Sequence, residues 1–230
     1  MKFNNDMLRL YAVTDRHWTG EKTLYEQVRD VLMGGATCLQ LREKDLDEAS
    51  FYEEAKNIKE LCRLFDVPFI INDNVMLAKE IDADGVHVGQ DDMACVKARE
   101  ILGPDKIIGV SAHTIEEARI AKEQGADYLG VGAIFPTSSK DDAEVLGIKR
   151  LKEITDTVDL PMVAIGGISY DNCLLLKDTG IDGIAVISAL FGQKNIKQAT
   201  IDLKKRVDAL YETMHTCLTI AGSDSSGGAG

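Results

Sequence analysis

The stretch GADYLGVGAIF, residues 125–135, places a turn of small residues directly before a nearly continuous apolar run. Such a run is typical of a strand that is buried on both faces, as in a parallel sheet. The same order recurs in GGATCL (from 34), DADGVHV (from 82) and GIDGIAV (from 180). Because each turn resembles the end of a helix, the repeat predicts helices that alternate with parallel strands.

Eight apolar runs of this kind follow one another along the chain, at 8–15, 37–42, 68–73, 85–89, 107–111, 128–135, 161–167 and 183–188. Segments with helical periodicity separate them, for example at Leu24, Val28 and Val31. Eight strand-then-helix units predict a closed (βα)8 barrel, or TIM barrel, in a single domain over residues 1–213. An open doubly wound sheet has the same alternation and is the alternative.

Length and composition limit the classes of function. The 230 residues suffice for one such barrel and leave no room for a second full domain. A net charge of -12 repels nucleic acids and anionic membranes, so we expect neither as a partner. No long apolar stretch or secretion signal is visible, which predicts a cytosolic protein. The five cysteines lie far apart without metal-ligand spacing and are expected to be reduced thiols.

Polar residues gather where the predicted strands end, which in a (βα)8 barrel is the side of the active site. They are Asp15, Gln40, Arg42, Lys44, Asn72, Asp73, His87, Gln90, Asp92, Ser111, His113, residues 137–140, Gly167 and Ser188. Strand ends also meet solvent, where polar residues are common, and this accounts for some of them, such as Asp15. Some combinations of these residues are not explained by solvent exposure alone, and they indicate a binding site more strongly.

Arg42 and Lys44 form the first such combination, because residues two apart can point to the same side of an extended chain. Two cations at a barrel mouth indicate an anionic ligand, to which Arg offers a bidentate fork and Lys a point charge. Asp73 and Asp92 follow neighbouring strands, and two such carboxylates suit Mg²⁺. They could equally be ion-pair partners of Arg42 and Lys44.

The seventh predicted strand runs into Gly166 and Gly167, and the eighth ends at Ser188. Backbone amides of these two loops form the recurrent phosphate site of the fold. The polar segment 136–147 is expected to be a mobile loop that covers the site. No arrangement typical of a catalytic nucleophile is visible, and His87, on an apolar strand, is more typical of a hydrogen-bonded core residue than of a catalyst.

The motifs YAVTD, QLREK, PFIINDN, GVHVGQDD, SAHT, GVGAIFPTSSK, AIGGI and AVISA follow in this order along the chain. Together they resemble the thiamine-phosphate synthase family over residues 8–212. The resemblance implies a transferase of thiamine biosynthesis that joins 4-amino-2-methyl-5-hydroxymethylpyrimidine diphosphate to 4-methyl-5-(2-phosphoethyl)thiazole. It also implies that pyrophosphate leaves first with the help of Mg²⁺ and that thiamine phosphate is the product.

The resemblance also assigns residues. It implies that the pyrimidine diphosphate is bound by Gln40, Leu41, Arg42, Lys44, Asn72, Ser111 and Lys140, and that Mg²⁺ is held by Asp73 and Asp92. The thiazole phosphate would be bound by Thr137, Ser138, Ser139, Gly167, Ile187 and Ser188. Arg42, Lys44, Ser111 and Lys140 would be the residues that assist the chemistry.

The last residues, 214–230, depart from this pattern. CLTIAGSDSSGGAG resembles the opening of a hydroxymethylpyrimidine phosphate kinase, which implies fusion to, or association with, a kinase domain; a flexible tail is the alternative. Two other functions also fit the fold. A thiazole tautomerase would not need the predicted metal carboxylates or the diphosphate cluster, and a non-catalytic sensor of phosphate ligands would bind without turnover.

Overall fold

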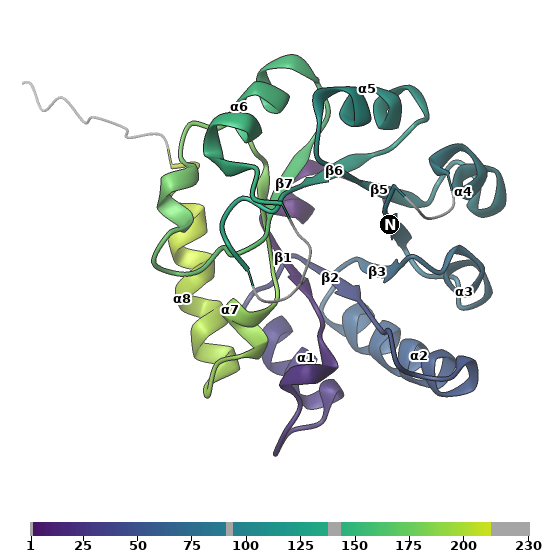
Figure 1. The fold of residues 1–230 in the computed structure, drawn as a ribbon. Helices are drawn as coiled ribbons and strands as arrows, with labels where there is room; N and C mark the ends of the chain where they lie inside the picture. The colour runs from purple at the N-terminus through teal and green to yellow at the C-terminus, as the bar shows by residue number, and fades with distance from the viewer. Residues whose placement is uncertain (1, 91–93, 138–143, 213–230) are drawn as a thin grey trace, which may run out of the picture.

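The computed structural model describes residues 2–90, 94–137 and 144–212. Its eight strands form a closed parallel barrel in the order β1 to β8, with helices around it (Figure 1). Strand β8 pairs with β1, so that Leu10 lies opposite Ile184. The predicted (βα)8 barrel is therefore confirmed, and the open doubly wound sheet is excluded.

Each strand coincides with one of the apolar runs. The strands are β1 (Leu10–Val13), β2 (Cys38–Leu41), β3 (Phe69–Asn72), β4 (Gly85–Val88), β5 (Ile107–Ala112), β6 (Tyr128–Val131), β7 (Met162–Ile165) and β8 (Gly183–Val186). The α-helices are α1 (Leu24–Met33), α2 (Glu48–Leu64), α3 (Val75–Glu80), α4 (Cys95–Leu102), α5 (Ile115–Glu123), α6 (Gly147–Thr157), α7 (Ser188–Phe191) and α8 (Ile196–Asp208). None of the described helices has the length and apolar character needed to span a bilayer.

The structure departs from regular alternation at three places. The 3-10 helices η1 (Asn5–Leu8) and η2 (Arg16–Trp18) flank β1, and the connection from β7 to β8 contains only the 3-10 helix η3 (Cys173–Leu176). Strand β6 ends at Val131, although the apolar run continues to residue 135. From Ile134 on, the chain bonds the end of β7 instead, where the Ile134 amide donates to the Ile165 carbonyl at 3.0 Å.

The apolar residues form two layers. Alternate strand residues such as Tyr11, Ile70 and Val163 fill the barrel interior, and their neighbours, such as Leu39 and Leu41, pack outward against the helices. Both faces of each strand are thus buried, which accounts for the nearly continuous apolar runs. Four cysteines of the described residues are buried and free, in agreement with the prediction of reduced thiols.

The repeated turns before the strands have a common function in the structure. In each, one polar side chain accepts a hydrogen bond from an amide at the start of a neighbouring strand. These bonds are Leu10 to Thr37 (2.8 Å), Phe69 to Asp84 (2.9 Å), Ile108 to Asp127 (2.7 Å) and Met162 to Asp182 (2.9 Å). Because each bond joins one turn to the strand before it in the barrel, the set holds adjacent strands in register.

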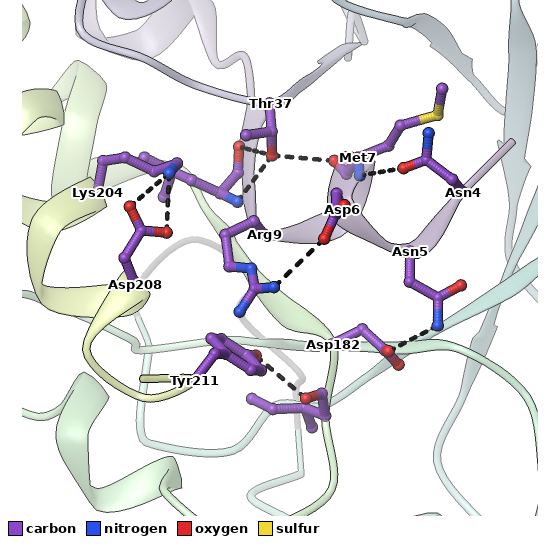
Figure 2. A network of polar contacts seen from close by, with 12 residues as sticks. Asn4, Asn5, Asp6, Met7, Arg9, Thr37, Asp182, Lys204, Asp208 and Tyr211 are labelled. Atoms are coloured by element: carbon purple, nitrogen blue, oxygen red, sulfur yellow. Dashed lines mark hydrogen bonds and ion pairs between the residues drawn. The ribbon is translucent and has the colours of Figure 1, made fainter. Parts of the chain in front are cut away.

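Figure 2 shows how the amino-terminal residues are joined to this end of the barrel. Asn5 donates to Asp182 at 2.9 Å, and the Thr37 hydroxyl donates to the Met7 carbonyl at 3.0 Å. Tyr211, after α8, donates to the Ile181 carbonyl at 3.1 Å. Residues near both ends of the described chain are therefore hydrogen-bonded to the amino-terminal side of the barrel.

A partly buried cluster of charged side chains at the opposite end joins the segments that follow β1 and β2. Arg16 donates to Glu43 at 2.8 Å and also forms an ion pair with Glu54 of α2. Glu43 lies between Arg42 and Lys44 in sequence, and its side chain is only 2% exposed. Burial, together with the neighbouring Glu43, raises the pKa of Glu54 to about 7 despite the opposing effect of Arg16.

We expect Asp127→Ala to destabilise the barrel, because it leaves the Ile108 amide without its acceptor and removes the partner of Arg99, 2.7 Å away. The loss should be about 2 kcal/mol, which lowers the melting temperature by about 4 to 8 °C. The control Glu60→Ala breaks the exposed pair with Arg63 and should cost less than about 0.5 kcal/mol. Equal melting temperatures for the two variants would contradict this role of the turn.

Glu54→Gln should change how stability depends on pH. The pKa of Glu54 is about 7 in the folded chain against an ordinary value of 4.5, so between these values the folded state binds more protons than the unfolded state. Stability must then fall as pH rises through this window. Because Gln does not ionise, the variant does not lose this stability. The melting temperature of the variant minus that of the parent should therefore be larger at pH 8 than at pH 5. The exposed Glu53→Gln on the same helix is the control; an equal difference at both pH values would refute the assignment.

Candidate active site

A cavity of about 410 Å³ opens at the carboxyl ends of the strands. All eight strands, or the residues directly after them, contribute to its lining. Most of the residues predicted from sequence lie here, namely Gln40, Arg42, Lys44, Asn72, Asp73, Ser111, Thr137, Gly167, Ile187 and Ser188. The structure therefore brings together residues that are up to 148 positions apart in the sequence, from Gln40 to Ser188.

Leu41 is the exception among the predicted residues that the structure describes. Its side chain is fully buried in the outer layer, between the strands and the helices, while that of Gln40 faces the cavity. Asp92, Ser138, Ser139 and Lys140 lie outside the described residues, and so does half of the predicted covering loop 136–147, namely residues 138–143. The tail 214–230 also lies outside them.

The predicted cation Lys44 and the predicted metal ligand Asp73 contact each other. Lys44 Nζ donates to Asp73 Oδ2 at 2.8 Å at a partly exposed position. The Asp73 backbone has a φ of 62°, in the left-handed region that Asp and Asn tolerate better than most residues. Its amide donates to the His87 carbonyl at 2.8 Å, which fixes the turn that presents the carboxylate.

Arg42 is held from its backbone. Its amide donates to the hydroxyl of Thr14 at 2.9 Å, and Thr14 is completely buried after β1. This bond fixes the Arg42 backbone, and Arg42 and Lys44 both line the cavity. Asp15, which was expected to have an ordinary strand-end role, caps η2 by accepting from the His17 amide at 3.0 Å.

Backbone amides dominate the opposite part of the rim, at β7 and β8. Gly167 has a φ of 65°, and a side chain there would overlap the carbonyl groups of Phe135 and Pro136. Ser188 is the first residue of the short helix α7 rather than the end of a strand. The amides of Gly167 and Ser188 donate to no acceptor within the described part of the chain. They are available to an anionic group of a ligand.

The floor of the cavity contains residues that the sequence patterns did not assign to the site. Tyr11 and Tyr128 meet inside the barrel, with 2.7 Å between their hydroxyl oxygens. His87 is joined to Tyr128 at 3.0 Å and to Ser111 at 2.9 Å. The expectation that His87 is hydrogen-bonded within the fold is confirmed, but its ring also lines the cavity. Polar aromatic residues within apolar runs were the available signal, because a buried Tyr hydroxyl needs a partner.

Two glycines make room for this floor. A side chain at Gly109 would overlap the Tyr128 ring and His87 Nδ1, and one at Gly130 would lie 3.1 Å from the His87 ring. Burial raises the pKa of Tyr11 and of Tyr128 well above the ordinary value, so both hydroxyl groups stay neutral. The two tyrosine hydroxyl groups of the floor are therefore polar and uncharged, whereas the rim carries charged side chains.

Among the residues that the structure describes, no group of three His, Cys, Asp or Glu residues gathers as a ready metal site. Asp73 is a hard oxygen donor at the rim and fits an ion that uses one or two carboxylates together with phosphate oxygens. Zinc, by contrast, favours clustered His and Cys ligands. The described donor set is thus compatible with Mg²⁺ bound jointly by protein and ligand.

Comparison with known proteins identifies the family. Residues 10–190 match the family model described as thiamine monophosphate synthase. A thiamine-phosphate synthase of Clostridium acetobutylicum is 49% identical over 82% of this chain and 90% of its own length. One of Methanobrevibacter smithii is 48% identical over 90% of this chain and 98% of its own length.

A solved structure agrees with these relatives. The thiamine phosphate pyrophosphorylase of Pyrococcus furiosus superposes with a TM-score of 0.84 at 43% identity, over 90% of this chain and 99% of that one. The fold, the cavity and the sequence relatives lead to the same assignment. The chain is a member of the thiamine-phosphate synthase family of transferases.

Proposed function

We propose that the cavity joins 4-amino-2-methyl-5-hydroxymethylpyrimidine diphosphate to 4-methyl-5-(2-phosphoethyl)thiazole, with Mg²⁺, and releases thiamine phosphate and pyrophosphate. One observation carries the proposal beyond family membership. A single cavity combines Arg42 and Lys44 on one part of its rim with the amides of Gly167 and Ser188, which donate to no described residue, on another, over a polar floor with two neutral tyrosine hydroxyl groups. The diphosphate and the thiazole phosphate would bind at these two parts of the rim, and the neutral rings would lie over the floor.

The diphosphate is placed at the cations. Arg42 offers a fork of donors to two phosphate oxygens, and Lys44 offers a compact charge. As the C–O bond breaks, negative charge grows on the departing pyrophosphate, and these groups stabilise it. Ser111 and Lys140 complete the set of residues that assist departure, Lys140 by its position in the family motif.

The two heterocycles meet over the floor. Gln40 and Asn72 bind the pyrimidine, while Thr137, Ser138, Ser139, Gly167, Ile187 and Ser188 bind the thiazole phosphate. Loss of pyrophosphate leaves a pyrimidine methyl cation, and the thiazole nitrogen supplies the electron pair of the new C–N bond. No proton has to be removed to form this bond, which agrees with the neutral hydroxyl groups of Tyr11 and Tyr128 in the floor.

We assign Mg²⁺ to Asp73 and Asp92. A bound Mg²⁺ would neutralise charge on the diphosphate and on the pyrophosphate that leaves. Asp73 supports this assignment because its carboxylate lies at the rim next to Lys44, the proposed diphosphate ligand. The assignment of Asp92 rests on the family motif alone.

Two further expectations rest on sequence arguments alone: a cytosolic location, and a kinase-like origin of residues 214–230. The comparisons support neither a fused nor an associated kinase. A thiazole tautomerase or a ligand sensor is less well supported, because relatives that match 82% to 90% of this chain are thiamine-phosphate synthases. A turnover assay separates the three functions.

In that assay, the purified chain should convert the two substrates to thiamine phosphate and pyrophosphate only when Mg²⁺ is present. Asp73→Asn keeps the left-handed backbone tolerable and removes the charge, so it should lower turnover by on the order of 100-fold. Binding of the thiazole phosphate alone should not change. Asp66→Asn, another left-handed Asp that is exposed and outside the cavity, should leave turnover unaffected. Binding of both substrates without any product would instead favour the sensor.

Lys140→Ala tests the proposed clamp on pyrophosphate. If Lys140 acts mainly as the C–O bond breaks, its loss should lower kcat more than it raises KM for the diphosphate. Lys140→Arg should restore only part of kcat, because a planar fork does not reproduce a compact ammonium. The exposed Lys149→Ala in α6 serves as control. Parent-like kinetics of Lys140→Ala would make it an ordinary surface lysine.

A further inference from the structure

We propose that Arg16 is a positioning residue for the diphosphate site. It holds the buried side chain of Glu43 and, through it, the segment that presents Arg42 and Lys44 to the cavity. The inference rests on the proposed function, since it concerns the anion that these two cations bind. It goes beyond that function by assigning a role to a residue that does not itself line the cavity.

The segment 42–47 joins β2 to α2 and belongs to neither element. Its two ends are fixed by hydrogen bonds. The Thr14 hydroxyl accepts from the Arg42 amide at 2.9 Å and donates to the Arg42 carbonyl at 3.3 Å, while Asp47 caps α2. Between these points, the amides of residues 43–46 donate to no acceptor that the structure describes. Side-chain contacts must therefore hold the middle of the segment.

Two ion pairs hold it, and they lie on different sides of the segment. Lys44 pairs with Asp73 on the cavity side at 2.8 Å. Glu43 does not line the cavity, and its carboxylate, only 2% exposed, accepts from Arg16 Nη2 at 2.8 Å and from Arg16 Nε at 3.3 Å. A guanidinium that donates to both oxygens of a carboxylate fixes its orientation as well as its distance.

Arg16 is itself well anchored. Its carbonyl accepts from the Thr19 amide at 3.0 Å and from the Thr19 hydroxyl at 2.8 Å. Its guanidinium also forms an ion pair with Glu54 of α2. The side chain therefore connects the short helix η2 both to the middle of the segment 42–47 and to the helix that follows the segment.

The charge of Glu43 makes its pairing with Arg16 important for the ligand. An unpaired carboxylate between Arg42 and Lys44 would attract both cations and compete with the diphosphate for them. Because Arg16 binds this carboxylate away from the cavity, the two cations keep their charge for the ligand. A diphosphate that attracts Lys44 also weakens its pair with Asp73, and the pair between Arg16 and Glu43 then remains to hold the segment.

Arg16→Gln tests this inference, because it removes the charge and the fork of donors and leaves a polar side chain. KM for the pyrimidine diphosphate should rise by about 10-fold, and kcat should fall, since the same two cations stabilise the departing pyrophosphate. KM for the thiazole phosphate should stay as in the parent. A purely structural role would lower only the amount of folded enzyme, so a lower kcat with both KM values unchanged would overturn the inference.

The matched control is Arg99→Gln, which breaks another partly buried pair of an arginine with a carboxylate, that with Asp127 at 2.7 Å. It should lower the melting temperature and leave both KM values as in the parent. If Arg16→Gln fails to fold, Arg16→Lys keeps the charge but not the fork, and it should raise KM for the diphosphate by about 3-fold. A parent-like KM in that variant would contradict the positioning role.

A double-mutant cycle shows whether Arg16 acts through Glu43. Glu43→Gln alone should also raise KM for the diphosphate, because the carboxylate that Arg16 holds is lost. In the double variant, the factor by which KM rises should be clearly smaller than the product of the two single factors. A factor equal to that product would mean that the two residues act independently, and it would overturn the inference.

Calorimetric titration with pyrophosphate in the presence of Mg²⁺ keeps the inference separate from the proposed function. If the parent makes no thiamine phosphate but binds pyrophosphate, and Arg16→Gln weakens this binding while Arg99→Gln does not, the reaction is wrong and the positioning role stands. If turnover occurs and Arg16→Gln binds pyrophosphate as tightly as the parent, the positioning role is wrong and the reaction stands. A parent chain that neither turns over nor binds pyrophosphate would refute both.

Discussion

The structure depends on one recurring interaction, the hydrogen bond from the start of a strand to a side chain in the turn before the next strand. Thr37, Asp84, Asp127 and Asp182 each accept such a bond. In a closed barrel an error in register between two strands would be passed around the ring, since every strand has two neighbours. By fixing register at the amino ends, these turns also fix which residues reach the carboxyl ends, where the cavity opens.

Most of the fold was predictable because each strand is buried on both faces. All eight apolar runs became strands, and the small-residue turns proved to carry the register bonds. The boundaries and one connection were not predictable. The run 128–135 is apolar throughout, yet β6 ends at Val131. Beyond it, the amides of Ile134 and Phe135 donate to the carbonyl groups of Ile165 and Gly166, outside the regular ladder between β6 and β7. The 3-10 helix η3 likewise keeps Cys173 and Leu176 buried, as a longer helix would.

The rim of the candidate site followed from position alone, since packing does not account for charged side chains that gather at the ends of apolar strands. The residues of the floor could not be predicted in this way, because both faces of each strand are buried. When both faces are apolar, the sequence does not say which residues face the interior. The family motif assigned Leu41 to the ligand, but its side chain packs outward; Tyr11 and Tyr128 were left out, although their hydroxyl groups form the floor.

The ion pair between Lys44 and Asp73 has a further meaning if both residues bind ligands. A cation that binds Asp73 releases the ammonium group for phosphate oxygens, and a diphosphate that attracts Lys44 releases the carboxylate for a cation. Thermodynamic linkage then requires each ligand to raise the affinity of the other by the same factor. Under that condition the metal and the diphosphate would bind cooperatively, because either one alone must first break the ion pair between Lys44 and Asp73.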